Sequence, residues 1–282
     1  MQRVVTGEQI SYVENLVFDI GLNRGQDTAN YLAKGYNVVA VEANPELVEF
    51  CSQRFSREIK MGRLAIVYGA ILRDGHCNSS VNTVEFFLNG NDAWGTVITD
   101  DTLQYSQRGA HDSIQVPIVN LTEVIEEHGM PYYLKTDIEG ADIACLEAIA
   151  KVEARPAYLS LESDVDSFQS VMRELELLED LGYNQFQVVN QKDLQKIIAP
   201  GSLLEYGGSG DFGQWLPADK WISGRSARRK YLELFAWYKL FSREGLLRET
   251  FLQKPLTSFL SSKLGYTIPS WHDTHAKHKD AS

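Results

Sequence analysis

Short apolar runs alternate with amphipathic stretches over the first two-thirds of the chain. Runs rich in β-branched and aromatic residues predict strands. Apolar positions three and four residues apart in Ser167–Leu181 predict a helix that ends at Gly182, and Asn44-Pro45-Glu46 has the residues of a helix start. The predicted strands are Leu16–Ile20, Asn37–Glu42, Leu64–Ala70, Val84–Leu88, Ile114–Val119, Tyr132–Asp137, Ala157–Glu162 and Gln185–Val189. Because strands and helices alternate, we expect an α/β fold with a doubly wound, mostly parallel sheet.

The alternation ends near Pro200. The segment Gly201–Gly213 is rich in glycine and serine and predicts a long loop, and Arg225–Arg248 predicts a helix with aromatic residues along one side. We therefore expect residues 1–200 to form one domain and residues 201–282 to form a loop and helical C-terminal extension, serving as a lid or a substrate-specificity region. The polar tail, with His272, His275 and His278, is expected to be solvated.

Composition excludes several classes of protein. The chain has 282 residues, of which 44% are hydrophobic, and its net charge is −11. This charge argues against a nucleic-acid partner, because binding a phosphate backbone needs basic side chains. No apolar run has the ~18–20 residues of a membrane span, and Met1–Asn15 lacks the apolar region of a secretory signal. Three widely spaced cysteines indicate reduced thiols rather than a disulfide or zinc site. We expect a cytoplasmic protein without an integral membrane segment.

A glycine-rich turn, Asp19 to Thr28, follows the first predicted strand, which is where doubly wound folds bind their ligand. Asn23 and Gln26 stand where a dinucleotide-binding fingerprint has its second and third glycines, so the pattern is D-x-G-x-x-x-G. Asp19 offers a carboxylate to a ligand ammonium, and Glu42 at the end of the second strand can accept hydrogen bonds from ribose hydroxyls. These features favour S-adenosylmethionine, which carries an ammonium and no phosphate. A purely structural turn remains the alternative.

Four segments in this order resemble motifs of the FkbM-type family of class I S-adenosylmethionine-dependent methyltransferases. They are Val17–Gly25, Val41-Glu42-Ala43-Asn44-Pro45, Ala70-Ile71 with Val84-Glu85-Phe86-Phe87, and Leu134-Lys135-Thr136-Asp137-Ile138-Glu139-Gly140-Ala141-Asp142. The resemblance covers Asn15 to Asn190 and departs from the family pattern at Leu22 and Asp142. It implies a Rossmann-like fold and S-adenosylmethionine as cofactor. The implied cofactor-binding residues are Asp19, Gly21, Asn23, Gly25, Thr28, Glu42, Asn44, Ala70, Ile71 and Asp137.

The candidate reaction centre lies at the end of the strand Tyr132–Asp137. Lys135 and Asp137 share one face of this strand, and Glu139 follows just beyond its end. Transfer of a methyl group to a hydroxyl requires removal of the hydroxyl proton, and these three residues are the candidate catalytic groups. Lys135 acts as a base only if burial lowers its pKa. A structural ion pair between Lys135 and Asp137 is the alternative.

Two further residues are candidates for the acceptor site. Trp94, in a loop, offers an apolar wall, and Glu162 ends the next strand. Asp137, Glu139 and Glu162 have oxygen ligands suited to magnesium, but scattered carboxylates are weak evidence and no metal is predicted.

The resemblance implies O-methylation of a hydroxyl on a small molecule, glycan or secondary metabolite. The alternatives are a nucleotide-dependent oxidoreductase or epimerase, against which Asn23 argues, and a non-catalytic cofactor-binding module, against which the intact acidic residues argue.

Overall fold

The computed structural model describes residues 10–73, 82–89, 95–97, 110–138, 142–163, 167–191, 208–241 and 271–281. The chain divides into two compact units, residues 1–159 with 280–282, and residues 160–279. The division falls inside strand β9 (Tyr158–Ser163). The boundary near residue 200 that composition suggests stays a prediction.

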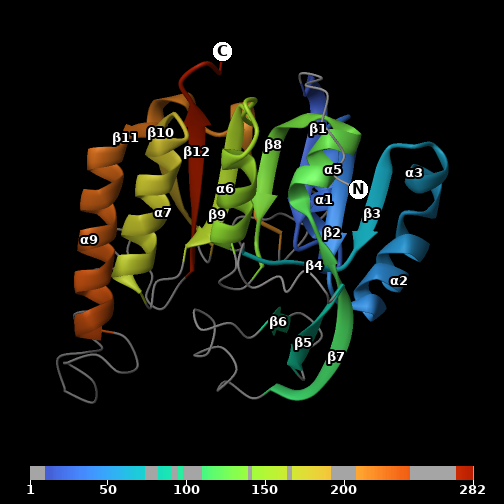
Figure 1. Cartoon of the computed structure of the whole chain (residues 1–282). Helices are drawn as coiled ribbons and strands as arrows, with labels where there is room; N and C mark the ends of the chain where they lie inside the picture. The colour runs from blue at the N-terminus through green and yellow to red at the C-terminus, as the bar shows by residue number, and fades with distance from the viewer. Residues whose placement is uncertain are drawn as a thin grey trace, which may run out of the picture. The chain divides into compact units, whose positions relative to one another are not determined.

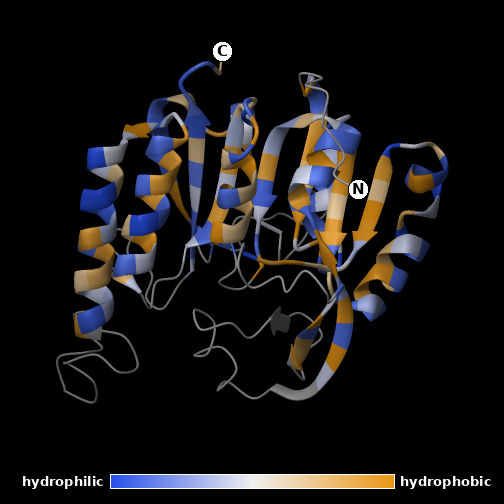
Figure 2. Cartoon of the chain, viewed as in Figure 1, coloured by the Kyte–Doolittle hydropathy of each residue, from blue (hydrophilic) through white to orange (hydrophobic). Residues whose placement is uncertain are grey.

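Four parallel strands form the sheet of the first unit (Figure 1). Their order is β8 (Met130–Thr136), β1 (Tyr12–Ile20), β2 (Asn37–Glu42) and β3 (Leu64–Tyr68). Every residue from Leu16 to Ile20 is buried, as is every residue from Val38 to Glu42. Both faces of β1 and β2 are therefore covered in these ranges, which explains the nearly continuous apolar sequences of the two strands (Figure 2). The predicted doubly wound α/β fold is confirmed.

Five helices in the described ranges belong to this unit, and two of them begin at an asparagine cap. They are α1 (Gln26–Ala33), α2 (Pro45–Arg54), α3 (Ser56–Lys60), α5 (Leu121–His128) and α6 (Asp142–Ala150). The Asn44 side chain accepts a hydrogen bond from the Glu46 N–H at the start of α2, as predicted. Asn120 caps α5 in the same way through the Thr122 N–H.

A second sheet in the same unit lies beyond the carboxyl ends of β1 to β3 (Figure 1). Its order is β4 (Ala70–Ile71), β7 (Ala110–Val119), β5 (Thr83–Asn89) and β6 (Gly95–Val97). Ala70, Phe86 and Val116 form its core. The predicted strand over residues 64–70 is split at Gly69, whose φ is 143° and where a Cβ would lie 2.5 Å from the Pro117 carbonyl oxygen. Gly69 thus lets the chain pass from one sheet into the other.

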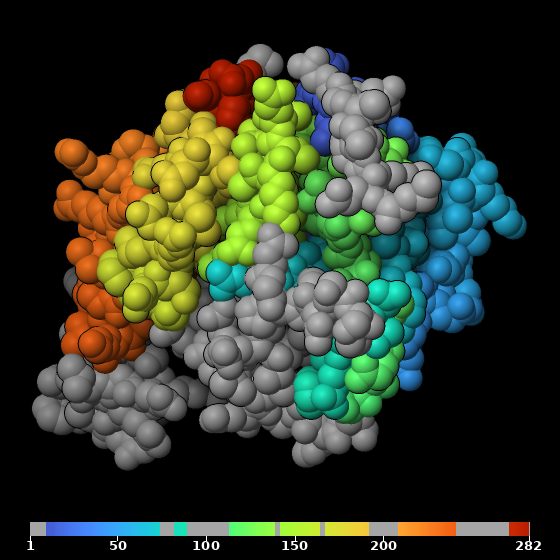
Figure 3. Space-filling view, in the orientation of Figure 1, coloured from blue at the N-terminus to red at the C-terminus, as the bar shows by residue number. Residues whose placement is uncertain are grey.

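The second unit contains strands in the order β11 (Ile222–Ser223), β10 (Tyr183–Asn190), β12 (His272–His278) and β9. Helices α7 (Phe168–Asp180) and α9 (Gly224–Phe241) pack against each other, in yellow and orange in Figure 3. Two short 3₁₀ helices, Gly213–Trp215 and Ala218–Lys220, precede β11. The helix predicted over Arg225–Arg248 is present as α9 up to Phe241, and residues 242–248 lie outside the described ranges. None of the helices in the described ranges is both long and apolar enough to cross a membrane.

The expectation of a solvated tail is wrong. His272 to Ala276 are buried in β12, which pairs antiparallel with β10. Partners inside the unit bond to two of its polar side chains: Asp273 Oδ2 accepts from Gln191 Nε2 at 2.6 Å, and Thr274 Oγ1 lies 2.6 Å from Ser163 Oγ. Prediction of a strand from sequence relies on alternating apolar residues, and β12 has too few of them. The strand still forms, because its ladder hydrogen bonds are made by the backbone and do not depend on the side chains.

Candidate functional site

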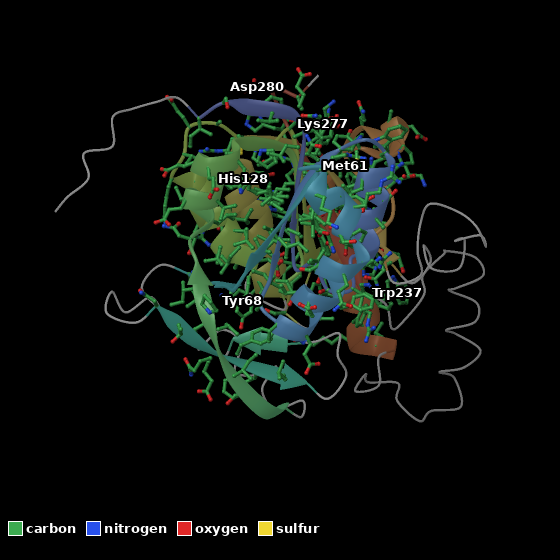
Figure 4. All side chains as sticks on the ribbon, turned by 90° about the vertical axis from the view of Figure 1, so that its right-hand side faces the viewer. Met61, Tyr68, His128, Trp237, Lys277 and Asp280 are labelled. Atoms are coloured by element: carbon green, nitrogen blue, oxygen red, sulfur yellow. The ribbon has the colours of Figure 1, made fainter. Side chains whose placement is uncertain are left out.

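The candidate site lies at the carboxyl ends of β1, β2 and β8 in the first unit's sheet. In Figure 4, Tyr68 marks this carboxyl edge at the end of β3, whereas Met61 and His128, which precede β3 and β8, mark the opposite edge. Parallel strands bring the residues after Ile20, Val41 and Thr136 together at this edge. The glycine turn, Glu42 and Asp137 are therefore neighbours.

The glycine turn has a left-handed backbone at three positions. The φ values of Gly21, Asn23 and Gly25 are 92°, 51° and 75°. Asparagine tolerates this conformation better than most residues do, which explains how Asn23 replaces a glycine. The N–H groups of Gly21 and Leu22 donate to the Val41 carbonyl oxygen at 3.0 and 3.1 Å, and so fix the turn to the end of β2.

Close packing restricts side chains at the two glycines, against main chain at Gly21 and against the Phe55 ring at Gly25. A Cβ on Gly21 would lie 2.1 Å from the Asp137 carbonyl oxygen, and a Cβ on Gly25 would lie 2.5 Å from Phe55 Cε2. Both distances are shorter than real Cβ atoms show. The fold alone therefore explains glycine at Gly21 and favours it at Gly25, and the contact of both with a cofactor stays a prediction.

Glu42 ties the turn to the start of α2. Its Oε2 accepts from the Asn23 N–H and its Oε1 from the Asn44 N–H, both at 2.8 Å. Burial raises the pKa of Glu42, while backbone hydrogen bonds from Asn44, Asn23 and Ala43 lower it. A carboxylate has roughly four acceptor sites, so about one remains beside these three donors from the described residues. That remaining site fits a ribose hydroxyl, the group expected from the sequence.

Asp19 is buried behind the turn, with 1% of its surface exposed. The Thr28 hydroxyl donates to its Oδ2 at 2.6 Å, and its Oδ1 has no hydrogen-bond partner among the described residues. Lys135 Nζ lies 4.0 Å from Oδ1. Burial raises the pKa of Asp19 to about 7, although Lys135 lowers it. The Thr28 side chain thus binds Asp19, and the predicted contacts of both residues with a cofactor stay predictions.

Lys135 is held by carboxylates. Its Nζ lies 2.8 Å from Asp27 Oδ2 and 3.1 Å from Asp137 Oδ2. Burial acts to lower the pKa of Lys135, but the negative charges of Asp27, Asp137 and Asp19 hold it well above its ordinary value. The pKa is raised rather than lowered, which argues against Lys135 as a base, and its catalytic role stays a prediction. The structural pair with Asp137 exists, but it is part of a larger cluster.

Sequence reasoning missed Asp27. It stands in the first turn of α1, where an acidic residue is ordinarily explained by the helix dipole. In the structure Asp27 is buried, and Tyr31 of the same helix packs edge-on against Tyr133 of β8 with ring centroids 5.8 Å apart. This packing directs Asp27 toward Lys135. Two sequence spacings indicate this arrangement. Asp27 and Tyr31 stand at the spacing of one helix face, and Tyr133 and Lys135 at the spacing of one strand face.

The other predicted residues have varied surroundings. Asn44 caps α2, and Ala70 and Ile71 are buried in β4, where they pair with β7. Glu162 belongs to β9 in the second unit and is partly buried. Trp94 and Glu139 lie outside the described residues.

Asp142 holds the chain that follows β8. Its Oδ1 accepts from the Ile138 N–H at 3.4 Å, and burial raises the pKa of Asp142 to about 6.

Within the part of the chain that the structure describes, no three His, Cys, Asp or Glu side chains form a group suited to a metal ion.

Comparison with known proteins gives one match to a family. The model described as Methyltransferase FkbM domain matches residues 19–185. No curated protein matches.

Several solved structures are similar to the chain. The methyltransferase FkbM from Methylobacillus flagellatus is 15% identical, with 67% of this chain and 42% of that chain covered and a TM-score of 0.39. The O-methyltransferase from Bacillus cereus is 14% identical, with 62% and 67% covered and a TM-score of 0.36. The precorrin-6y C5,15-methyltransferase from Geobacter metallireducens is 12% identical, with 64% and 69% covered and a TM-score of 0.35.

Proposed function

The chain belongs to the FkbM methyltransferase family, and from this premise we propose that it methylates a hydroxyl oxygen of a small molecule, glycan or secondary metabolite. The cofactor is S-adenosylmethionine, which supplies a methyl group activated by the adjacent sulfonium. The observation that carries the proposal is the pair of carboxylates, Glu42 and Asp137, on either side of the glycine turn. One is suited to bind the cofactor and the other to act on the acceptor.

Glu42 has the chemistry of a ribose-binding residue. Backbone N–H groups from both sides fix its carboxylate, so it is already oriented before a ligand arrives. Its remaining acceptor site is suited to a hydroxyl donor. The backbone at Gly21 and Asn23 brings the turn against the same carboxylate, which leaves main chain rather than bulky side chains next to the ligand.

Asp137 is the candidate base among the described residues. Its side chain is 35% exposed, in contrast to Asp19 and Lys135, so an acceptor hydroxyl can reach it. The contact with Lys135 at 3.1 Å orients the carboxylate, and a carboxylate in reach of the acceptor can take up the hydroxyl proton. Glu139, two residues further on, remains the second candidate for this role.

Calorimetric titration of the full chain with S-adenosylhomocysteine and, separately, with NAD tests the cofactor. We expect binding of S-adenosylhomocysteine and none of NAD. The opposite result would favour the oxidoreductase or epimerase alternative. Transfer of labelled methyl from S-adenosylmethionine to a panel of hydroxylated metabolites and glycans then tests the reaction. Cofactor binding with no transfer to any hydroxyl, but with transfer to amine or thiol analogues, would refute O-methylation.

A further inference from the structure

We propose that Asp27 is a positioning residue that draws the Lys135 ammonium toward α1, holds it 4.0 Å from Asp19 and thereby sets the charge of the Asp19 carboxyl. Asp19 begins the glycine turn, so its charge acts directly at the proposed cofactor site. This consequence for the cofactor rests on the proposed function, whereas the arrangement of the charges does not.

The geometry singles out Asp27 among the three carboxylates around Lys135. Its distance to Nζ, 2.8 Å, is the shortest, and both partners are buried, with side-chain exposures of 8% for Asp27 and 6% for Lys135. Asp137 lies at 3.1 Å but is 35% exposed, so water screens its charge more strongly. Asp19 lies further away, at 4.0 Å. The ammonium is therefore drawn toward α1 by Asp27, and its distance from Asp19 depends on that attraction.

The sheet register explains why these groups meet. Asp19 of β1 pairs with Lys135 of β8, so the two side chains emerge next to each other on one face. Helix α1 packs over β8 on this face and brings Asp27 to the same place. The titratable or polar groups that act on Asp19 or feel its charge are Lys135 from β8, Asp137 directly after β8, Asp27, Thr28 and Tyr31 from α1, and Cys51 from α2.

The charge of Asp19 is finely balanced. Burial raises the pKa of Asp19 to about 7, Lys135 lowers it, and Asp27 raises it. Two substitutions should therefore act in opposite directions. Loss of the Lys135 charge removes the group that keeps Asp19 ionised. Loss of the Asp27 charge removes a repelling carboxylate and also frees the ammonium to approach Asp19. If Asp27 served only in packing, the two substitutions would not shift the pKa of Asp19 in opposite directions.

Carboxyl ¹³C NMR titration of the full chain tests the proposal, with the Asp19 signal assigned from an Asp19→Asn variant. We expect the midpoint of Asp19 to fall in Asp27→Asn and to rise by about one to three pH units in Lys135→Met. If Lys135→Met does not fold, Asp27→Asn/Lys135→Met is compared with Asp27→Asn, since removing both partners leaves no unpaired charge of that pair. The midpoint should again rise when Lys135 is replaced.

The control variant is Glu147→Gln, which removes a carboxylate from a half-exposed ion pair with Arg73 in the same unit. It should leave the Asp19 midpoint unchanged. An unchanged Asp19 midpoint in Asp27→Asn, or a rise, would overturn the proposal.

The cofactor arm uses calorimetric titration with S-adenosylhomocysteine between pH 5.5 and about 8.5. Affinity in the wild type should increase as Asp19 loses its proton near pH 7, and Asp27→Asn should shift that increase to lower pH. If the wild type does not bind the ligand at any pH, the proposed function fails, while the NMR result still decides the role of Asp27. If the ligand binds and Asp27→Asn leaves the pH profile unmoved, the positioning role is refuted.

Discussion

Gly21 offers the sharpest test of how the glycine turn is built. In Gly21→Ala the new Cβ would lie 2.1 Å from the Asp137 carbonyl oxygen and 2.9 Å from its carbon. Since real Cβ atoms essentially never come within 3.0 Å, β1 and the end of β8 would have to separate by about 0.9 Å. That movement would strain the hydrogen bond from the Asp137 N–H to the Ile20 carbonyl oxygen, which is 2.9 Å long.

The cost has three parts, and the first can be separated from the other two. A left-handed backbone costs a residue with a Cβ about 1–2 kcal/mol. Overlap with the immobile backbone adds about 1–3 kcal/mol, and weakening of the Asp137 hydrogen bond adds about 1 kcal/mol. Gly35 is a matched control, because its φ of 94° is close to the 92° of Gly21, but a Cβ there would meet nothing within 4 Å. We expect Gly35→Ala to show the backbone cost alone.

Urea denaturation of the wild type and both variants measures the free energy of unfolding. Gly21→Ala should lose about 3–6 kcal/mol and Gly35→Ala about 1–2 kcal/mol. Calorimetric titration with S-adenosylhomocysteine, on whatever folded fraction Gly21→Ala retains, then reports its effect on the ligand. Equal destabilisation of the two variants would refute the argument from the Asp137 contact. Normal stability with lost ligand binding in Gly21→Ala would instead show that Gly21 makes room for the cofactor.

The remaining predictions concern the site and the second unit. Glu42→Gln should weaken S-adenosylhomocysteine binding by about 1.5–3 kcal/mol and also destabilise the fold, since one backbone N–H then faces an amide NH₂; unchanged affinity in a folded variant would remove Glu42 from the cofactor site. Asp137→Asn should lower kcat ~100-fold with little change in acceptor affinity, and near-normal turnover would move the role of base to Glu139. Burial lowers the pKa of His275 to about 4, and neither ring nitrogen has a hydrogen-bond partner among the described residues. The unfolded state therefore binds the proton first, and this histidine makes the free energy of unfolding fall as the pH drops from about 6.5 to about 4; denaturation curves of His275→Leu should lack this fall, and an unchanged pH dependence would contradict it. Tyr231→Phe should cost about 1–2 kcal/mol in urea denaturation, because the hydroxyl bonds to both Ser163 and Thr274; a loss below about 0.3 kcal/mol would show that these bonds contribute nothing net.

Local sequence signals determined most of the parallel sheet and several helix boundaries. The apolar run Asn37–Glu42 has the same bounds as β2, and Ser167 caps α7 through the Ser170 N–H, one residue ahead of the helix. Such signals lie within a few residues of the sequence, as propensity, capping residues and apolar runs, so they can be found without knowing any tertiary contact. The motif order also identified the family.

Tertiary structure alone decided how the site residues are used. Asp27 and Lys135 are far apart in sequence, and only the packing of α1 over β8 makes them an ion pair. The same contact determines that Lys135 is a fixed cation, because its pKa depends on carboxylates from three different elements. Strand β12 likewise could not be predicted from the sequence. Its backbone pairs with β10 despite its polar side chains, and a partner such as Gln191 for Asp273 comes from elsewhere in the fold. Charge state and strand pairing are properties of surroundings, and those surroundings exist only once distant segments have met.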